Sequence, residues 1–504
     1  MAGIAEILKA ESLKMWYDGF ILIFREEMTS MDRQSFEQQF ETISDQIWEF
    51  AETRYQEFRS SALQADFLEK EGFTVTRNLG GIATAFSASF GSGHPVIGLL
   101  GEYDALPRMN QTADSPEKQA DRPGTAGHGC GHNLLGTGTM EAACLLRDWL
   151  LQTHSDGTII CFGCPAEEGG AGKAFLTRSG CFDGLDFALA WHPGSKTGLI
   201  KEALANIRVI FDFTGKSAHA AAHPELGRSA LDACELMNVG VNYLREHVKS
   251  DARMHYAYLN DGGDAPNIVP AAATLLYALR APESSYVAEL YERVSDVAKG
   301  AALMTGTRVS YRTVSAYADL LSAPAMEELM MEAIQEAEKP EYTEEDYAYA
   351  AQFMLLPKVS DSADSDFHSD FRTDSSSALK LDPVRTAAAS SHTSIDTDIL
   401  PAGQTINLGS TDVGDVSWQV PTGLIGVATE ATGCALHTWQ IVAQGKSPLA
   451  HKGMHYAARI LFAAAKKLYE SPERCARIQK DYRNAKGNRK YQSMLPDSVK
   501  PGDF

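Results

Sequence analysis

Apolar side chains with helical spacing run through the first 70 residues of the chain. The clearest series recurs with acidic residues between its members: Phe36, Phe40, Ile43, Ile47 and Phe50. A stripe of this kind buries one face of a helix and leaves the opposite face in water. The pattern therefore predicts helices over residues 1–70.

Short apolar or alternating runs follow, and one longer apolar run at about 134–152 has the length of a helix. The short runs predict strands at residues 73–76, 83–90, 95–100, 158–164 and 187–191. Continuous apolar strands are typical of a sheet that is covered on both faces. Strands alternating with helices therefore predict an α/β domain with a central sheet.

The pattern changes near residue 206, where an amphipathic strand begins. The elements expected there are strand, helix, strand, strand, helix and strand, at residues 205–213, 228–247, 253–260, 273–280, 283–303 and 307–313. This order resembles a ferredoxin-like α+β sandwich. We expect a second domain at residues 206–315, inserted into the first and dividing it into residues 1–205 and 316–504.

Helical and strand-like patterns return after the inserted domain. Residues 323–357 are helical and acidic in pattern, whereas residues 359–394 are rich in Ser, Asp and Thr and predict a solvated loop or insertion. An apolar run at 423–428 predicts another buried strand, and residues 454–468 predict a closing amphipathic helix.

Composition narrows the classes of partner and compartment. The 504-residue chain carries a formal net charge of −21, which argues against binding to nucleic acid or to anionic membranes. An anionic substrate would therefore need a local basic pocket. No run of about 18 apolar residues or signal-peptide core is present, so we expect no membrane span. The eight scattered cysteines suit reduced thiols, and we expect a cytoplasmic protein.

A glycine-rich turn at residues 127–133 carries the first candidate chemistry. Cys130 and His132 lie two positions apart on this turn, where the glycines allow both side chains to face one metal ion. The alternative is a buried cysteine beside a histidine that caps the following helix. The turn alone does not decide between these interpretations.

Further polar residues follow the apolar strands that are expected in the α/β sheet, where functional sites of such sheets gather. Asp104, Glu167, Glu168 and His192 each lie just past one of these strands, and His437 lies on a later loop. The candidate metal ligands are Cys130, His132, Glu168, His192 and His437.

Thiolate, imidazole and carboxylate are groups that Zn²⁺ or Mn²⁺ would accept. Five protein ligands exceed the three of a typical single catalytic zinc, so the set predicts two divalent metals with a bridging ligand and a water. Asp104 is a candidate partner for the His132 ring. Glu167, adjacent to the ligand Glu168, is a candidate general base.

A CxxC pair, Cys161 and Cys164, lies inside an apolar strand. No second CxxC or suitably spaced His pair accompanies it. We therefore interpret the pair as core packing and not as a redox or metal site.

Several motifs together resemble the M20 family of metallopeptidases and amidohydrolases, in its aminoacylase-like branch. They are GLLGEYDALP (98–107), GHGCGHNLLGTG (127–138), CPAEEGG (164–170), WHP (191–193), GKSAHAAAHPELGRSALDA (215–233), PNIVP (266–270), STDVGDVSW (410–418) and LHTWQIVAQGKSPLAHKGM (436–454). They span most of the chain. The Ser/Asp-rich stretch matches none of them, and Asn133 stands where many relatives have Asp.

The resemblance implies a catalytic α/β domain with an inserted dimerisation, or lid, domain. It implies the same five metal ligands, with Glu167 as the base. His219 would reach into the partner subunit's active site and stabilise the tetrahedral oxyanion. Asn267 and Arg280 would help to recognise the substrate carboxylate.

The implied activity is metal-dependent hydrolysis of the amide bond of an N-acyl or N-aroyl amino acid, with aroyl-glutamate as the first candidate. A dipeptidase or a general N-acyl-amino-acid deacylase remains an alternative, as does a non-catalytic subunit. A homodimer through the lid domain is expected, with a homologous companion subunit as the second option.

Overall fold

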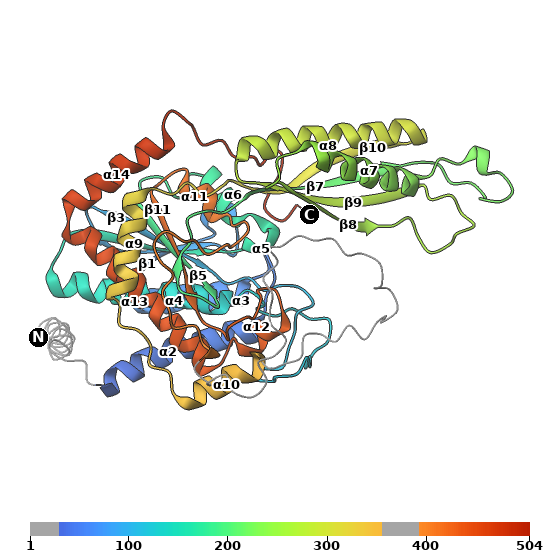
Figure 1. Ribbon diagram of the computed structural model, residues 1–504. Coiled ribbons are helices and arrows are strands. Elements are labelled where there is room, and N and C mark those ends of the chain that lie inside the picture. Colours follow the sequence, from blue (N-terminus) through green and yellow to red (C-terminus); the bar gives the residue numbers. More distant parts are fainter. Residues whose placement is uncertain (1–29, 355–392, 504) are drawn as a thin grey trace, which may run out of the picture.

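A computed structural model describes residues 30–354 and 393–503 (Figure 1). The described chain contains two β-sheets, one of seven strands and one of four. The first 29 residues of the predicted N-terminal helices lie outside the described residues, as does the predicted insertion at 359–394 apart from its last two positions.

The seven-stranded sheet is mostly parallel at its centre. Its order is β1-β2-β4-β3-β5-β11-β6, with β4, β3, β5 and β11 parallel to one another and β1, β2 and β6 antiparallel to their neighbours. The bounds are β1 Thr74–Arg77, β2 Phe86–Ser92, β3 Val96–Glu102, β4 Gly157–Cys164, β5 Phe187–Gly194, β6 Gly198–Leu199 and β11 Thr422–Ala428. The predicted α/β sheet is confirmed.

Helices pack on both faces of this sheet (Figure 1). They are α2 Ser30–Phe50, α3 Phe58–Lys70, α4 His132–Thr153, α5 Glu167–Gly170, α6 Gly172–Arg178, α9 Pro324–Glu336, α10 Glu344–Met354, α11 Val413–Ser417, α12 Trp439–Gln444, α13 Pro448–Glu470 and α14 Pro472–Lys486. The predicted closing helix is α13, which begins six residues earlier than expected because Ser447 caps it and Pro448 opens it. Helix α14 was not predicted.

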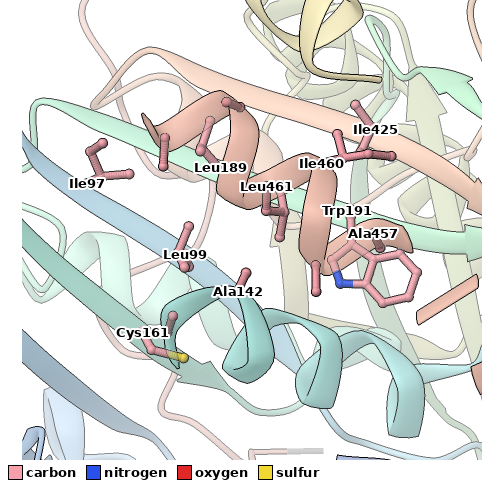
Figure 2. Close-up of a cluster of buried hydrophobic side chains, with 14 of the residues drawn as sticks. Ile97, Leu99, Ala142, Cys161, Leu189, Trp191, Ile425, Ala457, Ile460 and Leu461 are labelled. Carbon is pink, nitrogen blue, oxygen red and sulfur yellow. The ribbon is translucent and has the colours of Figure 1, made fainter. Parts of the chain in front are cut away.

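Strand and helix side chains interlock in the core between the sheet and helices α4 and α13. Leu99 of β3, Leu189 of β5 and Ile425 of β11 lie beside Leu461 of α13, and Ala142 of α4 faces the same strands (Figure 2). All are almost fully buried. This packing fixes the strand ends that carry the polar residues described below.

The four-stranded sheet has the order β10-β7-β9-β8, with every pair antiparallel. Helices α7 and α8 cover one face of it (Figure 1). The bounds are β7 Ala205–Thr214, α7 Ala230–Leu244, β8 Arg253–Asn260, β9 Ala272–Ala281, α8 Ser284–Thr305 and β10 Arg308–Tyr317. The predicted ferredoxin-like order is present, and we call this unit the lid.

The lid projects to one side of the larger sheet and is joined to it through the start of β7 and the end of β10 (Figure 1). Its strands run from Ala205 to Tyr317. These bounds support a division of the chain near residues 206 and 315, which stays a prediction.

Candidate active site

The candidate site lies beyond the carboxyl ends of the parallel strands. Asp104 follows β3, the Glu167–Gly170 turn follows β4, and His192 lies within the last three residues of β5. His192 was expected just after its strand. β5 is longer because its parallel pairing with β11 continues through His192 as far as Gly194.

The glycine-rich turn brings Cys130 and His132 to this edge of the sheet. Gly131 has φ of 72°, in the left-handed region, and a Cβ atom there would lie 2.9 Å from the side chain of Pro193. His132 is the first residue of α4, so the turn places Cys130 and His132 side by side against β5. Both side chains are buried.

The structure brings all five predicted ligands together in two groups. The first group is Cys130, His132 and His192, and the second is Cys130, Glu168 and His437. Within each group the ligand atoms lie within 4.8 Å of one another, and the Cys130 thiol belongs to both. Sγ of Cys130 is 3.4 Å from Nε2 of His192, and Oε1 of Glu168 is 3.1 Å from Nε2 of His437.

The donor atoms fit a pair of divalent cations. A thiol, three imidazoles and a carboxylate converge. The buried Nε2 of His132 forms no hydrogen bond among the described residues, and the oxygen that faces it is Oε2 of Glu102 at 3.3 Å. A buried ring nitrogen without a partner costs free energy unless a ligand satisfies it. His437 is held in position at φ of 63° by its backbone N–H, which donates to the carbonyl of Gly129 at 2.7 Å.

Asp104 holds two of these groups in place. Its Oδ1 is 3.0 Å from Nδ1 of His132, and its Oδ2 accepts the backbone N–H of Glu168 at 2.8 Å. Nδ1 of His132 is therefore engaged, and Nε2 is left as the ring nitrogen that can bind a metal. This geometry supports the predicted role of Asp104 as a partner of the His132 ring.

Glu167 and Glu168 lie on a tight turn with different electrostatic surroundings. Burial, together with the charges of Glu102 and Glu168, raises the pKa of Glu167 well above its usual range. Burial also acts on Glu168, but His437 and His132 outweigh it and lower the pKa of Glu168. Two adjacent carboxyls are thus set up for different tasks, one protonatable and one anionic.

A buried ion-pair network supports the site from behind, and sequence reasoning missed it. Nζ of Lys173 lies 2.6 Å from Oε1 of Glu102 and 2.5 Å from Oδ1 of Asp412, and all three residues are buried. The other oxygen of Glu102 faces Nε2 of His132 at 3.3 Å. Glu102 and Asp412 both lie in motifs noted above, but no spacing could show that they meet through one lysine.

A pocket of about 500 Å³ opens in front of the two ligand groups. Cys130, Glu167, Glu168, His192 and His437 line it on the side of the large sheet. The lid contributes the facing wall, which consists of Asn206, Arg208, Arg280 and Tyr317, and residues 407–410 close one end.

This lid wall is basic, and sequence reasoning found only one of its members. Arg280 of β9 was predicted, whereas Arg208 and Asn206 of β7 were not. The pattern gave only a weak signal, because residues 206 and 208 lie on the polar face of this amphipathic strand, opposite Ile207 and Val209, as solvent-facing residues also would. Burial and the nearby Arg208 lower the pKa of Arg280, and neither guanidinium forms an ion pair with any residue in 30–354 or 393–503.

His219 and Asn267 do not line this pocket in the same chain. Both are exposed on adjoining loops of the lid, where the backbone N–H of Ala220 donates to the carbonyl of Asn267 at 2.9 Å. Nδ1 of His219 accepts from the backbone N–H groups of Ala221 and Ala222 at 3.2 and 3.1 Å. The structure thus brings these two predicted residues together, but not to the ligand groups of their own chain.

The CxxC pair lies within β4, and both thiols are free and buried. Burial raises the pKa of Cys161 to about 12. A neutral buried thiol is unreactive. This environment fits the predicted packing role.

Comparison with known proteins places the chain in a family. The profile of the M20 peptidase dimerisation domain matches residues 203–303, which correspond to most of the lid. A subunit of the p-aminobenzoyl-glutamate hydrolase of Escherichia coli K12 is 42% identical over 467 residues, covering 92% of this chain and 96% of that protein. The chain belongs to the M20 peptidase family.

Solved structures show the same M20 fold. An aminobenzoyl-glutamate utilization protein from Klebsiella pneumoniae superposes with a TM-score of 0.53 at 17% identity, over 87% of this chain and 97% of that one. A dinuclear metal-binding peptidase of the M20 family from Bacillus subtilis gives a TM-score of 0.51 at 16% identity, over 85% of this chain and 99% of that one. The predicted two-domain M20 architecture is confirmed.

The M20 assignment also makes the chain a hydrolase of the peptidase and amidohydrolase class, as predicted from its motifs. Among the described helices, none combines the length and the apolar character that crossing a membrane would require. The M20 dimerisation domain indicates assembly into a dimer or a larger oligomer.

Proposed function

We propose that this protein is a metal-dependent amidohydrolase that cleaves p-aminobenzoyl-glutamate to p-aminobenzoate and glutamate. The observation that carries the proposal is the meeting of two metal-ligand groups and a basic wall in one pocket. The relative with 42% identity is named for this reaction, which supports the choice of substrate.

The metal ligands of the proposal are Cys130, His132, Glu168, His192 and His437, and the cofactor is a pair of Zn²⁺ or Mn²⁺ ions. When bound, such ions polarise the amide carbonyl and make water acidic enough to react near neutral pH. The two ligand groups share Cys130, so its thiol would be among the groups that hold the ions in either group. Asp104 keeps the His132 ring oriented for binding.

Glu167 is the proposed general base. It lines the pocket beside the ligand Glu168 but belongs to neither of the two ligand groups that share Cys130. In the proposed reaction its carboxylate takes a proton from the attacking water and then gives that proton to the leaving amine nitrogen. Burial and the neighbouring carboxylates raise its pKa, which makes the Glu167 carboxylate a better proton acceptor than an ordinary glutamate.

Recognition of the amino-acid half is assigned to the basic wall. Arg208 and Arg280 carry positive charge into a pocket of a chain whose net charge is −21. Guanidinium groups bind carboxylates through paired hydrogen bonds, and Asn206 offers an amide beside them. A glutamate leaving group presents two carboxylates, which suits two adjacent arginines.

We expect Arg208→Gln and Arg280→Gln each to lower kcat/KM for p-aminobenzoyl-glutamate by roughly 10- to 100-fold, because each variant loses a charge-assisted hydrogen bond to the substrate. Steady-state kinetics with varied substrate concentration would measure kcat/KM. Arg293→Gln, on the outer side of α8 and paired with Glu289, is the matched control and should leave kcat/KM unchanged. Unchanged kinetics in both pocket variants would remove the arginines from substrate recognition.

The proposed assembly is a homodimer through the lid, with a homologous companion subunit as the alternative. β8 is an edge strand of the lid sheet, and Tyr256 and Leu259 on it are exposed, as are Val239 and Tyr243 of α7. An open strand edge beside exposed apolar side chains is suited to pairing with a second chain. All eight cysteines are free, which supports the proposed cytoplasmic location.

The test is an assay of the purified protein with p-aminobenzoyl-glutamate, N-acyl amino acids and dipeptides. Each substrate is supplied after chelation and again after addition of Zn²⁺ or Mn²⁺, and the released amine is measured by chromatography. We expect p-aminobenzoate to appear only with metal. Metal-dependent cleavage of other substrates alone would move the substrate to the alternative classes, and metal-loaded protein without any turnover would contradict the enzymatic proposal.

A further inference from the structure

A second lobe of about 350 Å³ adjoins the pocket that holds the ligand groups. The two share His192, Asn407, Leu408 and Leu436, so the lobe begins where the ligand groups end. The lobe is separate from the basic wall, because neither Arg208 nor Arg280 of the lid lines it. A substrate held at His192 can therefore extend one half into each space.

Apolar and polar side chains share the walls of this lobe. The aliphatic and proline side chains come from the end of β5, from the segment after it and from the chain that follows residue 399: Pro193, Ile200, Leu400, Ile406, Leu408 and Leu436. Gly426 of β11 allows this packing, since a Cβ atom there would lie 2.5 Å from Cδ1 of Ile406. A lobe of this volume with such an apolar side accommodates a six-membered aromatic ring.

Ser195, Lys196, Gln404 and Thr405 supply polar parts of the lining, and Glu430 is its one acidic side chain. It lies two residues beyond β11 and is only 3% exposed. Backbone hydrogen bonds hold the residues on either side of Glu430. The N–H of Thr429 donates to the carbonyl of Gly194, and the N–H of Ala431 donates to Oε1 of Gln444.

The Glu430 carboxyl has no partner in the described parts of the chain, neither a hydrogen-bond donor nor a cation. Burial raises the pKa of Glu430 to about 8. A buried carboxyl without a partner is costly to keep, so its presence in this lobe points to a ligand that satisfies it. In either protonation state it retains an oxygen that accepts a hydrogen bond.

We propose that this lobe binds the aromatic acyl half of the substrate and that Glu430 accepts a hydrogen bond from a donor group on the ring, such as the 4-amino group of a p-aminobenzoyl unit. This inference rests on the proposed function, since it assigns the acyl half of the same substrate. It makes Glu430 the residue that distinguishes aminobenzoyl from plain benzoyl substrates.

The experiment compares kcat/KM for p-aminobenzoyl-glutamate and benzoyl-glutamate in the wild type, Glu430→Met and Glu430→Gln. A site built around a hydrogen bond rejects an analogue that lacks the donor, so the wild type should prefer the amino compound by roughly 10- to 100-fold. Glu430→Met should abolish the preference, and Glu430→Gln, which keeps an acceptor oxygen, should retain part of it. An unchanged preference in Glu430→Met would overturn the proposal.

Benzoyl-glutamate separates this proposal from the proposed function. Its metal-dependent cleavage reports the amidohydrolase activity without any contribution from the ring amine. If the wild type cleaves neither compound, the proposed function fails, and the lobe is then tested by calorimetric binding of p-aminobenzoate and benzoate to the metal-loaded protein. Equal affinities would overturn the role of Glu430.

Glu202→Met, at an exposed position outside both spaces, is the matched control, and thermal melting verifies that each variant is folded.

Discussion

Glu167→Gln is expected to lower kcat for p-aminobenzoyl-glutamate by roughly 10²- to 10⁴-fold, the range for loss of a general base. Glutamine has nearly the same shape but cannot take the proton of the attacking water. Glu167 belongs to neither ligand group that contains Cys130 and is grouped instead with Glu102 and His132. Both groups around Cys130 therefore stay complete in the variant, which should still bind metal. Steady-state kinetics would measure kcat, and elemental analysis of the dialysed protein would measure the bound metal.

The neighbouring carboxyl provides the matched control for this prediction. Glu168→Gln changes a proposed ligand, so it should lose metal as well as activity. If Glu167→Gln kept the turnover of the wild type, the base would have to be another group. If Glu167→Gln lost metal to the same extent as Glu168→Gln, the two residues would have been assigned the wrong tasks.

His219→Ala is expected to lower kcat by roughly 10²- to 10³-fold, as loss of an oxyanion-stabilising group does. The reason is the position of His219, which is exposed on the lid and absent from the pocket of its own chain. In a dimer it would act in the partner's pocket. The loss should therefore be relieved when the His219→Ala chain is mixed with a chain that supplies an intact histidine.

Mixing Glu167→Gln with His219→Ala tests this exchange directly. In a mixed dimer one pocket carries both defects and the other carries none, so an equimolar random mixture should recover about a quarter of the wild-type activity. Each variant mixed with itself is the control and should stay inactive. Failure to recover activity, with subunit exchange verified by mass spectrometry of the native dimer, would place the function of His219 within one chain or outside catalysis.

The candidate site was predictable where the sequence places a polar residue directly after an apolar strand. Asp104 and Glu167 follow β3 and β4, His192 lies at the end of β5, and parallel strands bring their carboxyl ends to one edge. The glycine turn alone left Cys130 and His132 undecided, and they could be added because the rest of the chain supplies the other ligand types. The βαββαβ order of the lid was also predictable, because apolar residues recur at a different spacing in its strands than in its helices.

Other features depend on contacts that no spacing reveals. Lys173 joins Glu102 to Asp412, which lies 239 residues after the lysine in the sequence, and Arg208 meets Arg280 only because β7 and β9 pair in the lid sheet. Glu430 lies in no regular pattern, and its significance appears only when the apolar lobe around it is assembled. His219 is a different case, since the role predicted for it would depend on a second subunit.

The two sides of the pocket come from different sheets. The proposed metal ligands are on the large sheet, whereas Arg208 and Arg280 are on the lid, which is joined to that sheet through the ends of β7 and β10. In the proposed complex a substrate with a free carboxylate would span both sides, so the attraction at the lid would help to align the amide at the metal ligands. Binding energy gained far from the scissile bond then appears as rate, and amides without that carboxylate should react slowly even at saturating concentration.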